Sequence, residues 1–450
     1  MKRSLRILFL SILPILQVSG YQNCGKCCKL PEDPMCHDPR LEVVYLYQDQ
    51  WPNAFTMTPC GRKFSCYPAG IDSKNVNDGC NGKFQVAELK DCIEVPFPNY
   101  CINNPEGGVI SNCNGTLTTR GLKHHFISVQ TLVYDKKTNR MMCLDAGRAR
   151  TCNQVLLPAS RGGIKLVVVD MCNDCVARIY YFPEDVADLQ RSYLISLALD
   201  PCKNVAYIAD ALGYSIIVLD LCTGKSYVAF QDETTRNYPF RLPVSWGQPE
   251  YSIGSTGVCS PIISSITLGI TPMCLSPCGD KLYYAGLTSR RLYSVCTAAL
   301  LNRTLTFADV AQTVRNHGGR GMSEGMTCDE QGVVWSGSME NNAISFHNPN
   351  CPFAMNCIYI RDPRLSWVYS PIAHEDGYIY FLCPDLQGIS LVYPGTGPIG
   401  VDRRQKPYVL YRFKRPCGSL CASFCDPATL GLEVCPPDSC SCNDIGVKSH

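Results

Sequence analysis

After its first twenty residues, the sequence contains no apolar run long enough to cross a membrane, since a spanning helix needs about 20 such residues. Charges of one sign do not form blocks either: 41 Lys and Arg residues are interspersed with 39 Asp and Glu residues, and the formal net charge is +2. A phosphate-binding glycine loop is also absent. We therefore expect no nucleic-acid partner, no membrane span, no metal and no cofactor.

Cysteine, in contrast, is abundant, with 30 residues in the chain. Residues 1–20 have the form of a secretory signal peptide, because Lys2, Arg3 and Arg6 precede the short apolar run Ile7–Leu16 and small residues follow it. Outside the cytosol, an even number of cysteines predicts disulfides, here as many as fifteen. The sequence thus predicts a secreted, extracellular protein whose cysteines are mostly oxidised.

Ten cysteines gather at the two ends of the chain, where we expect them to pair. They are Cys24, Cys27, Cys28, Cys36, Cys417, Cys421, Cys425, Cys435, Cys440 and Cys442. An alternative is that these clusters mediate self-association of the protein. The sequons at Asn114 and Asn302 predict N-glycosylation in the same compartment.

One phrase recurs along the middle of the chain: a polar turn, a strand rich in Val, Ile and Tyr, and a second polar break. Its copies are Thr131–Asp145, Leu199–Lys225, Cys274–Ala285, Met326–Ser336 and Ile372–Leu382. Each copy is too small to bury its own face, so the copies must pack on one another. Repeated hairpins of this kind favour an all-β β-propeller, with a pair of β-sandwiches as the alternative.

The composition divides the chain into four parts. We expect a signal peptide at 1–20, a Cys-rich lead at 21–40, a propeller at 41–415 and a Cys-rich tail at 416–450. Leu41–Tyr47 is the first expected strand, and we expect it to close the ring by joining the last blade. Thr297–Arg315 is the only helix-like segment, with a break at Thr304–Thr306.

The order of several phrases resembles the yellow and major royal jelly protein family. The phrases are His125–Val133 with Leu144–Gly147, Val205–Asp210 with Leu212–Tyr214, Arg291–Tyr293, and Gly377–Leu382 before Leu386-Gln387. The resemblance implies a six-bladed propeller, secretion, and a pocket at one end of the central channel. It also implies one of several roles, because some members bind biogenic amines, some are credited with converting melanin precursors such as dopachrome, and others are storage or structural proteins.

One departure from the family affects the expected pocket. Where the family usually has Ser-Asn-Arg, this chain has Cys383-Pro384-Asp385. The resemblance implies that the family's Asn belongs to the amine pocket, so Asp385 would add a negative charge there, suited to a cationic ligand. The alternative is a solvated turn residue.

Other candidate ligand-binding residues are Asp210, Tyr214, Glu324 and Asn342. Asp145, Asp210 and Glu324 flank predicted strands, where carboxylates could do acid–base work or bind a divalent cation with Asn341 or Asn342. Turn hydrogen bonds are the alternative for these acids. The aromatic candidates for the channel wall are Tyr214, Trp335, Phe346 and Trp367, with core packing as the alternative.

The remaining candidates are better read as structural. His124, His125 and His317 have no spacing that would supply the four ligands of a zinc site. Cys172 and Cys175 imitate a redox motif but lack its βαβ context.

These observations support three candidate functions for the protein. The leading one is noncovalent binding of a small, cationic aromatic ligand. The second is an enzyme acting on dopachrome-like or lactone-like substrates, and the third is a disulfide-linked structural protein.

Overall fold

A computed structural model of the chain describes residues 37–416, apart from 153, 239–240, 255–261 and 350–356. Strands predominate in this part, and the α-helices are single short turns, α1 (Tyr100–Asn103), α2 (Thr297–Leu301) and α3 (Phe307–Ala311). The prediction of an all-β fold is confirmed. None of the helices in the described ranges is both long and apolar enough to span a membrane.

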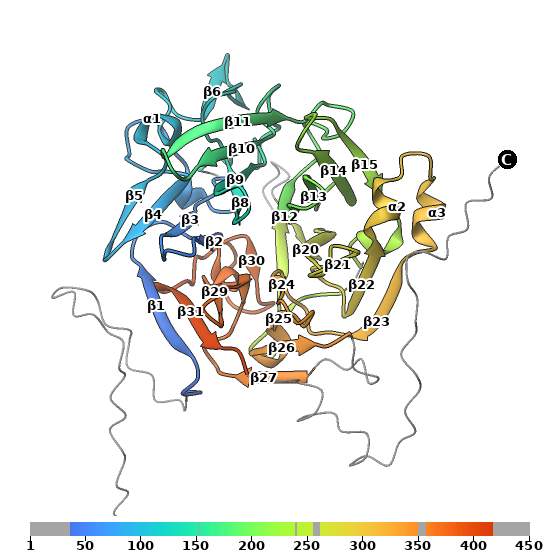
Figure 1. Cartoon of the computed structure of the whole chain (residues 1–450). Coiled ribbons are helices and arrows are strands. Elements are labelled where there is room, and N and C mark those ends of the chain that lie inside the picture. Colours follow the sequence, from blue (N-terminus) through green and yellow to red (C-terminus); the bar gives the residue numbers. More distant parts are fainter. Residues whose placement is uncertain (1–36, 153, 239–240, 255–261, 350–356, 417–450) are drawn as a thin grey trace, which may run out of the picture.

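Six antiparallel sheets of four strands each lie around a common centre in the described residues (Figure 1). From the innermost strand outward, sheets 1 to 3 consist of β2 (Ala54–Met57), β3 (Lys63–Cys66), β4 (Val86–Lys90) and β5 (Ile93–Pro96); β8 (Val129–Asp135), β9 (Arg140–Asp145), β10 (Lys165–Asp170) and β11 (Cys175–Tyr181); and β12 (Leu194–Asp200), β13 (Val205–Asp210), β14 (Ser215–Asp220) and β15 (Ser226–Phe230).

Sheets 4 to 6 complete the circle in the same way. They consist of β20 (Ile270–Leu275), β21 (Lys281–Gly286), β22 (Arg291–Cys296) and β23 (Arg315–Gly319); β24 (Met326–Cys328), β25 (Val334–Ser338), β26 (Ala343–His347) and β27 (Cys357–Arg361); and β28 (Tyr369–Ala373), β29 (Tyr378–Cys383), β31 (Tyr408–Lys414) and β1 (Glu42–Tyr47).

The innermost strands make the arrangement a closed ring. The innermost strands of neighbouring sheets contact one another in the order β2, β8, β12, β20, β24 and β28, and β28 contacts β2 again. Middle strands are buried on both faces because a neighbouring sheet covers each face; all six residues of β13 are buried. This explains why the strand reads as an almost continuous apolar run in the sequence.

The ring is closed by strands from opposite ends of the described chain. β1 pairs antiparallel with β31, with Val43 opposite Tyr411 and Tyr47 opposite Tyr408. The predicted role of Leu41–Tyr47 as the closing strand is therefore confirmed. The predicted helical segment is divided as expected, because Thr306 caps α3 and separates it from α2. Its predicted end is wrong, since α3 ends at Ala311 and Arg315 begins β23.

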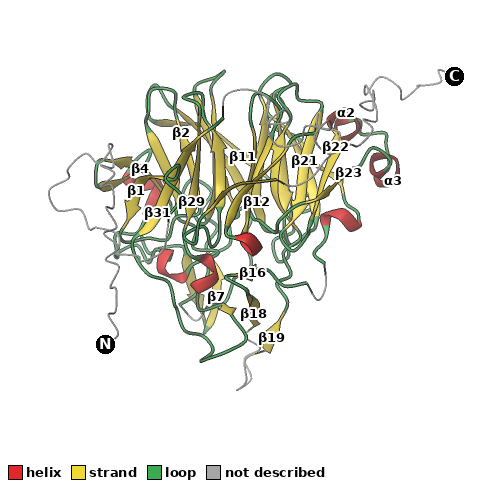
Figure 2. Cartoon of the chain, turned by 90° about the horizontal axis from the view of Figure 1, so that it is seen from below, coloured by secondary structure: helices red, strands yellow, loops and turns green. Residues whose placement is uncertain are grey.

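Small insertions gather at one end of the ring, here called the insertion face (Figure 2). They are the hairpin β6 (Ile110–Cys113)–β7 (Thr116–Thr119), the pair β16 (Val244–Ser245)–β17 (Gln248–Pro249), and a sheet of β18 (Tyr251–Gly254), β19 (Ile262–Ser264) and β30 (Val392–Tyr393). The last sheet joins the long insertion after sheet 3 to the loop between β29 and β31. The sheet of β18, β19 and β30 covers one end of the central channel, where Ser252 and Val392 line the cavity described below.

The structure describes only part of the cysteines, so it tests only part of the cysteine predictions. Described cysteines such as Cys60, Cys66 and Cys143 are free thiols, whereas Cys92 is disulfide-bonded. The expectation that most cysteines are oxidised is thus not confirmed, and the ten terminal cysteines lie outside the described residues, as does the expected signal peptide. Asn114 and Asn302 are both exposed, so their glycosylation remains a prediction.

A buried ion pair holds sheet 2 together. Lys165 on β10 lies opposite Asp145 on β9, with its Nζ 3.2 Å from the carboxylate, and neither side chain is exposed. The carboxylate also accepts hydrogen bonds from the backbone N–H groups of Ile127, Ser128 and Gly147. Asp145 therefore ties the chain entering β8 to the second and third strands of the sheet.

We predict that Lys165→Met destabilises the protein by about 3 kcal/mol, because it leaves the buried Asp145 carboxylate without its cation. Urea denaturation followed by circular dichroism measures the change. The control is Arg161→Ala, which removes the exposed Arg161–Glu184 pair and should change stability by less than about 0.5 kcal/mol. Similar effects of the two substitutions would contradict the structural role of the buried pair.

Candidate functional site

A cavity of about 210 Å³, here called the central cavity, lies in the channel toward the insertion face. Most of its wall is apolar and comes from Leu and Ile side chains, of which Ile195 lies on the inner strand β12 and the others lie in turns, loops and the covering segments. The exceptions that matter chemically are Arg150, Tyr193, Glu324 and Trp367. A concave apolar wall with a few convergent polar groups is the usual form of a small-molecule site.

Glu324 is the acidic group of this wall. It precedes β24 and is only 6% exposed, and its Oε2 accepts a hydrogen bond of 2.9 Å from the indole N–H of Trp367. Burial raises the pKa of Glu324 to about 7, although hydrogen bonds from Trp367 and Tyr369 favour the charged form. The carboxyl is therefore close to half ionised at neutral pH, and a nearby cation would favour its charged form.

Two further polar groups face the same space. The buried Tyr193 hydroxyl lacks a well-formed hydrogen bond. Arg150 donates from Nε and Nη2 to the carbonyl oxygen of Gly70, at 3.1 and 2.9 Å. Gly70 itself must be glycine, because a Cβ there would lie 2.7 Å from the Tyr193 hydroxyl. The backbone thus approaches the cavity closely enough to bring these groups together.

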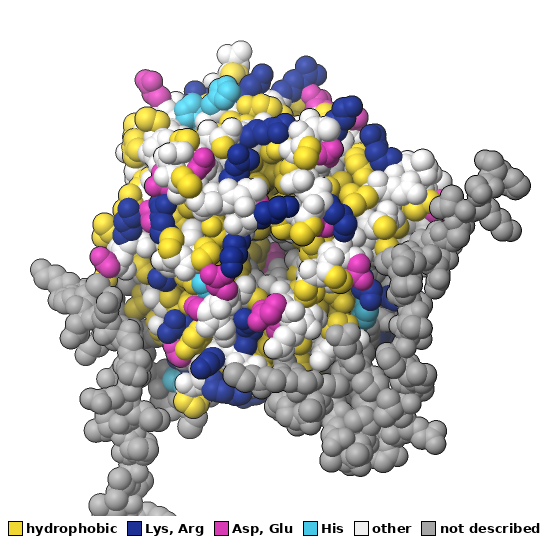
Figure 3. Space-filling model, in the orientation of Figure 1, with side chains coloured by type: hydrophobic (Ala, Val, Ile, Leu, Met, Phe, Trp, Pro, Cys, Tyr) yellow, Lys and Arg dark blue, Asp and Glu magenta, His cyan; other side chains and the backbone are white. Residues whose placement is uncertain are grey.

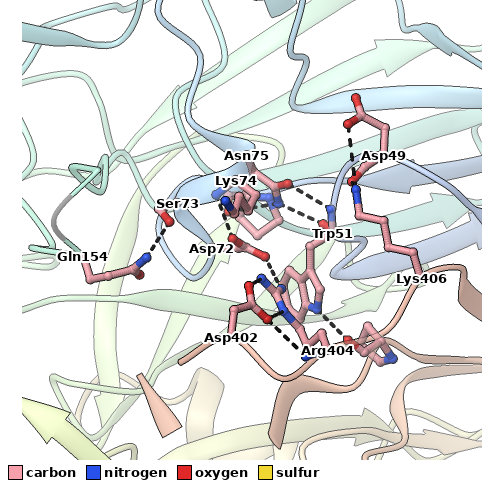
Figure 4. Close-up of polar contacts among 12 residues, drawn as sticks. Asp49, Trp51, Asp72, Ser73, Lys74, Asn75, Gln154, Asp402, Arg404 and Lys406 are labelled. Atoms are coloured by element: carbon pink, nitrogen blue, oxygen red, sulfur yellow. Dashed lines mark hydrogen bonds and ion pairs between the residues drawn. The ribbon is translucent and has the colours of Figure 1, made fainter. Parts of the chain in front are cut away.

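An ion-pair network fixes the part of the wall that follows β29 (Figure 4). Arg404 pairs with Asp72, and also with Asp402 at 2.6 Å. The Trp51 indole N–H donates to the carbonyl oxygen of Pro384 at 2.8 Å. A Cβ on Gly388 would lie 2.8 Å from the Arg404 side chain, so the loop that supplies Leu386, Ile389 and Val392 to the cavity packs tightly against this network.

A second chamber of about 280 Å³ lies further along the channel, between the inner strands. Segments of β8, β12, β20, β24 and β28 line it, and it shares Ile195 and Glu324 with the central cavity. We call it the hairpin-side chamber, because it lies further from the insertion face than the central cavity does. Glu324 therefore lies where the two spaces meet.

The structure places only one of the predicted ligand-binding residues, Glu324, in the wall of the central cavity. Asp210 accepts hydrogen bonds of 2.8 Å from the backbone N–H groups of Tyr193 and Gly213, as a turn residue does. Tyr214 donates from its hydroxyl to the carbonyl oxygen of Thr267 at 3.0 Å, so it supports the wall from behind. Asn342 donates to the Leu365 carbonyl oxygen at 3.3 Å, away from the cavity residues.

Asp385 is next to the wall without being part of its lining. It has a left-handed backbone conformation (φ 51°) and directly precedes the lining residue Leu386. Its Oδ1 accepts hydrogen bonds from Ser366 and Gln387, at 3.1 and 3.4 Å, and burial raises its pKa. Its role in a pocket remains a prediction.

Among the other aromatic candidates, Trp367 lines the cavity, whereas Trp335 and Phe346 pack in the core beside β29 and β31. Within the described ranges, no three His, Cys, Asp or Glu side chains are arranged to hold a metal ion. Arg150 and Tyr193 were not recognised in the sequence, because no local pattern marks them and the fold alone brings them together.

Gly321–Gly325 has the G-x-S-x-G spacing that marks a nucleophilic serine in α/β-hydrolases. Here Ser323 is fully buried, and its hydroxyl donates to the carbonyl oxygen of Gly325. Gly321 is constrained by contact, because a Cβ there would lie 2.0 Å from the Ser338 hydroxyl. The motif forms a bent segment before β24 that places Glu324 in the cavity wall.

We predict that Glu324→Gln gains stability relative to the parent protein as the pH rises from about 4.5 to about 7. The unfolded carboxyl has a pKa near 4.5 and the folded one has a pKa of about 7, so the unfolded chain releases this proton first and the folded state loses stability over that interval. The relative gain should reach up to about 3 kcal/mol above pH 7.

Urea denaturation at about pH 5 and about pH 8 measures this difference, since glutamine retains an oxygen to accept the Trp367 hydrogen bond. A stability difference between variant and parent that is the same at both pH values would contradict the buried, protonated state of Glu324.

Comparisons with known proteins follow the same part of the chain. A family model described as major royal jelly protein matches residues 127–389. Major royal jelly protein 5 of Apis mellifera is 27% identical over 270 residues, which cover 57% of this chain and 38% of that protein. Major royal jelly protein 6 of Apis mellifera is 22% identical over 267 residues, which cover 58% of this chain and 53% of that protein. The matched region thus spans about half or less of the length of these relatives.

Solved structures with a similar course of the chain include virginiamycin B lyase from Staphylococcus aureus, with 10% identity, a TM-score of 0.41, and coverage of 83% of this chain and 98% of the other. A gluconolactonase from Xanthomonas campestris has the same identity and TM-score and coverage of 84% and 89%. At this degree of similarity, neither structure bears on the function of the chain.

Proposed function

This chain belongs to the major royal jelly protein family, and we propose that it is a secreted six-bladed propeller that binds a small, cationic aromatic ligand in its central cavity. The observation that carries the proposal is Glu324, a buried carboxyl in a wall that is otherwise mostly apolar. An extracellular location is supported by the form of residues 1–20 and by the cysteine content.

The size of the cavity favours a ligand with one or two rings. Its volume is about 210 Å³, below the roughly 300–1,000 Å³ of pockets that hold drug-sized molecules. Leu and Ile side chains supply apolar contact for a ring, and the contribution of such contact grows with the area removed from water.

The charge of the wall favours an amine at one end of the ligand. Shielded from water, the Glu324 carboxylate would attract an ammonium group more strongly than an exposed carboxylate does. The Trp367 indole holds the carboxyl in place and presents an aromatic surface suited to a cation. Arg150, already bonded to the Gly70 carbonyl oxygen, disfavours a second positive charge and suits an oxygen substituent on the ring.

We predict that binding of an aromatic amine at about pH 6 releases a proton. Glu324 is mostly protonated at that pH and must ionise to pair with the ammonium group. Isothermal titration calorimetry in two buffers with different ionisation enthalpies measures the release as a difference in apparent binding enthalpy. Glu324→Gln should abolish the release and weaken binding roughly 10- to 100-fold.

The control is Glu340→Gln, which removes a partly buried carboxylate that is paired with Arg290 outside the cavity and should leave both affinity and proton release unchanged. Neutral analogues with the same ring should bind the parent and Glu324→Gln alike. Unchanged affinity of Glu324→Gln for every amine that binds the parent would contradict the proposed role of Glu324.

A second variant, Asp385→Asn, tests the contribution of the neighbouring carboxylate. The substitution retains the shape of the side chain and removes its charge, and we expect it to weaken amine binding by roughly 1–3 kcal/mol if Asp385 contributes to the same field. Neutral analogues should be affected far less. Equal amine affinity in the folded variant and the parent would leave Asp385 as a turn residue.

The same protein sample distinguishes the other two functions. Conversion of dopachrome above that of a boiled control would favour an enzyme, and reducible oligomers on a nonreducing gel would favour a disulfide-linked assembly. Either result without amine binding would replace the proposal.

A further inference from the structure

Two cysteines lie next to each other where sheets 4 and 5 meet. Cys274 is on β20 and Cys328 is on β24, and these innermost strands contact each other. The two side chains lie close enough for Cys328 to contribute to the raised pKa of Cys274. Both residues pack in one apolar cluster with Tyr283 and Val334, and both line the hairpin-side chamber.

Backbone pairing fixes both positions. Cys274 lies opposite Tyr283 of β21, and Cys328 lies opposite Val334 of β25. Each cysteine is therefore held within its own sheet, and a bond between the two sulfurs would join two sheets that otherwise only pack against each other. The described residues offer no third His, Cys, Asp or Glu that would make the pair a metal site.

The surroundings of the two cysteines favour a disulfide that forms during folding and is afterwards shielded from soluble reagents. Burial raises the pKa of Cys274 well above its usual range, and the nearby Arg320 guanidinium opposes this only in part. Because the thiolate is the reactive form, the native dithiol should react slowly with soluble reagents. Oxidation is then expected while the two sheets are coming together, before the chamber is closed.

We propose that Cys274 and Cys328 form a disulfide that fastens sheet 4 to sheet 5 beside the central channel. In the first step, one cysteine thiolate attacks a small-molecule or protein disulfide, and a mixed disulfide forms as one thiol of the oxidant leaves. In the second, the other cysteine attacks the mixed disulfide at the sulfur of its partner, and the second thiol leaves. Two protons and two electrons pass from the pair to the oxidant. The proposal is independent of the ligand.

Peptide mapping of the full chain tests the bond directly. Protein from the medium of secreting cells is denatured without reductant, alkylated, and cleaved with cyanogen bromide and then trypsin. Cleavage after Met326 and Met339 releases Thr327–Met339, in which Cys328 is the only cysteine, and cleavage after Met273 and Lys281 releases Cys274–Lys281. We expect mass spectrometry to find these two peptides linked, with little alkylated Cys328.

Cys278 shares the second peptide with Cys274, so the mapping is repeated on Cys278→Ser, in which the link should persist. In Cys328→Ala, Cys274 should become available for alkylation after denaturation. The matched control is Cys383→Ala, which removes another buried cysteine and should leave the link intact.

Refolding of the reduced chain in mixed reduced and oxidised glutathione should restore the same link. Quantitative alkylation of both cysteines in the parent protein from the medium would overturn the proposal. So would a link from Thr327–Met339 to any cysteine other than Cys274.

Discussion

Every sheet of the ring depends on the sheets at its two sides. A middle strand such as β13 is buried on both faces, and no part of its own sheet could cover those faces. Each sheet therefore needs a neighbouring sheet on each face. The last sheet is completed by β1, which comes from the start of the described chain. The pairing of β1 with β31 therefore completes the last sheet of the ring, because without it sheet 6 would lack its outer strand. The channel that holds both cavities exists only when this ring is closed (Figure 1).

The candidate site is a consequence of that geometry. Residues distant in sequence, such as Arg150, Tyr193, Glu324 and Trp367, face one cavity because they lie at the inner ends of different sheets or in the loops beside them. Space-filling atoms show a hollow at the centre of the opposite face, with Lys, Arg, Asp and Glu side chains around it (Figure 3). The interior is therefore distinguished from the rim by its chemistry. Charges at the rim are mixed, whereas the central cavity combines an apolar surface with one carboxyl of raised pKa.

The sequence predicted local features well and contacts between sheets poorly. The strand phrases and the break at Thr306 depend on neighbouring residues, and both agree with the structure. The pairing of β1 with β31 is a long-range contact, which was predicted from the closure of the ring and not from a local pattern. The sequence did not distinguish the roles of Asp145 and Asp210 from that of Glu324, since all three acids flank strands. Only the structure shows that Asp145 pairs with Lys165 and that Asp210 binds turn N–H groups. The contact between Cys274 and Cys328 depends on the order of the sheets, which local patterns do not contain.

The central claim is that an ammonium group pairs with Glu324 inside the ring. An experimental structure of the full chain with an aromatic amine tests it most directly. The account predicts electron density for the ligand in the central cavity, with the amine nitrogen within hydrogen-bonding distance of the Glu324 carboxylate and the ring against the apolar wall. A bound amine elsewhere on the protein, with the cavity filled by water or by its own side chains, would contradict it.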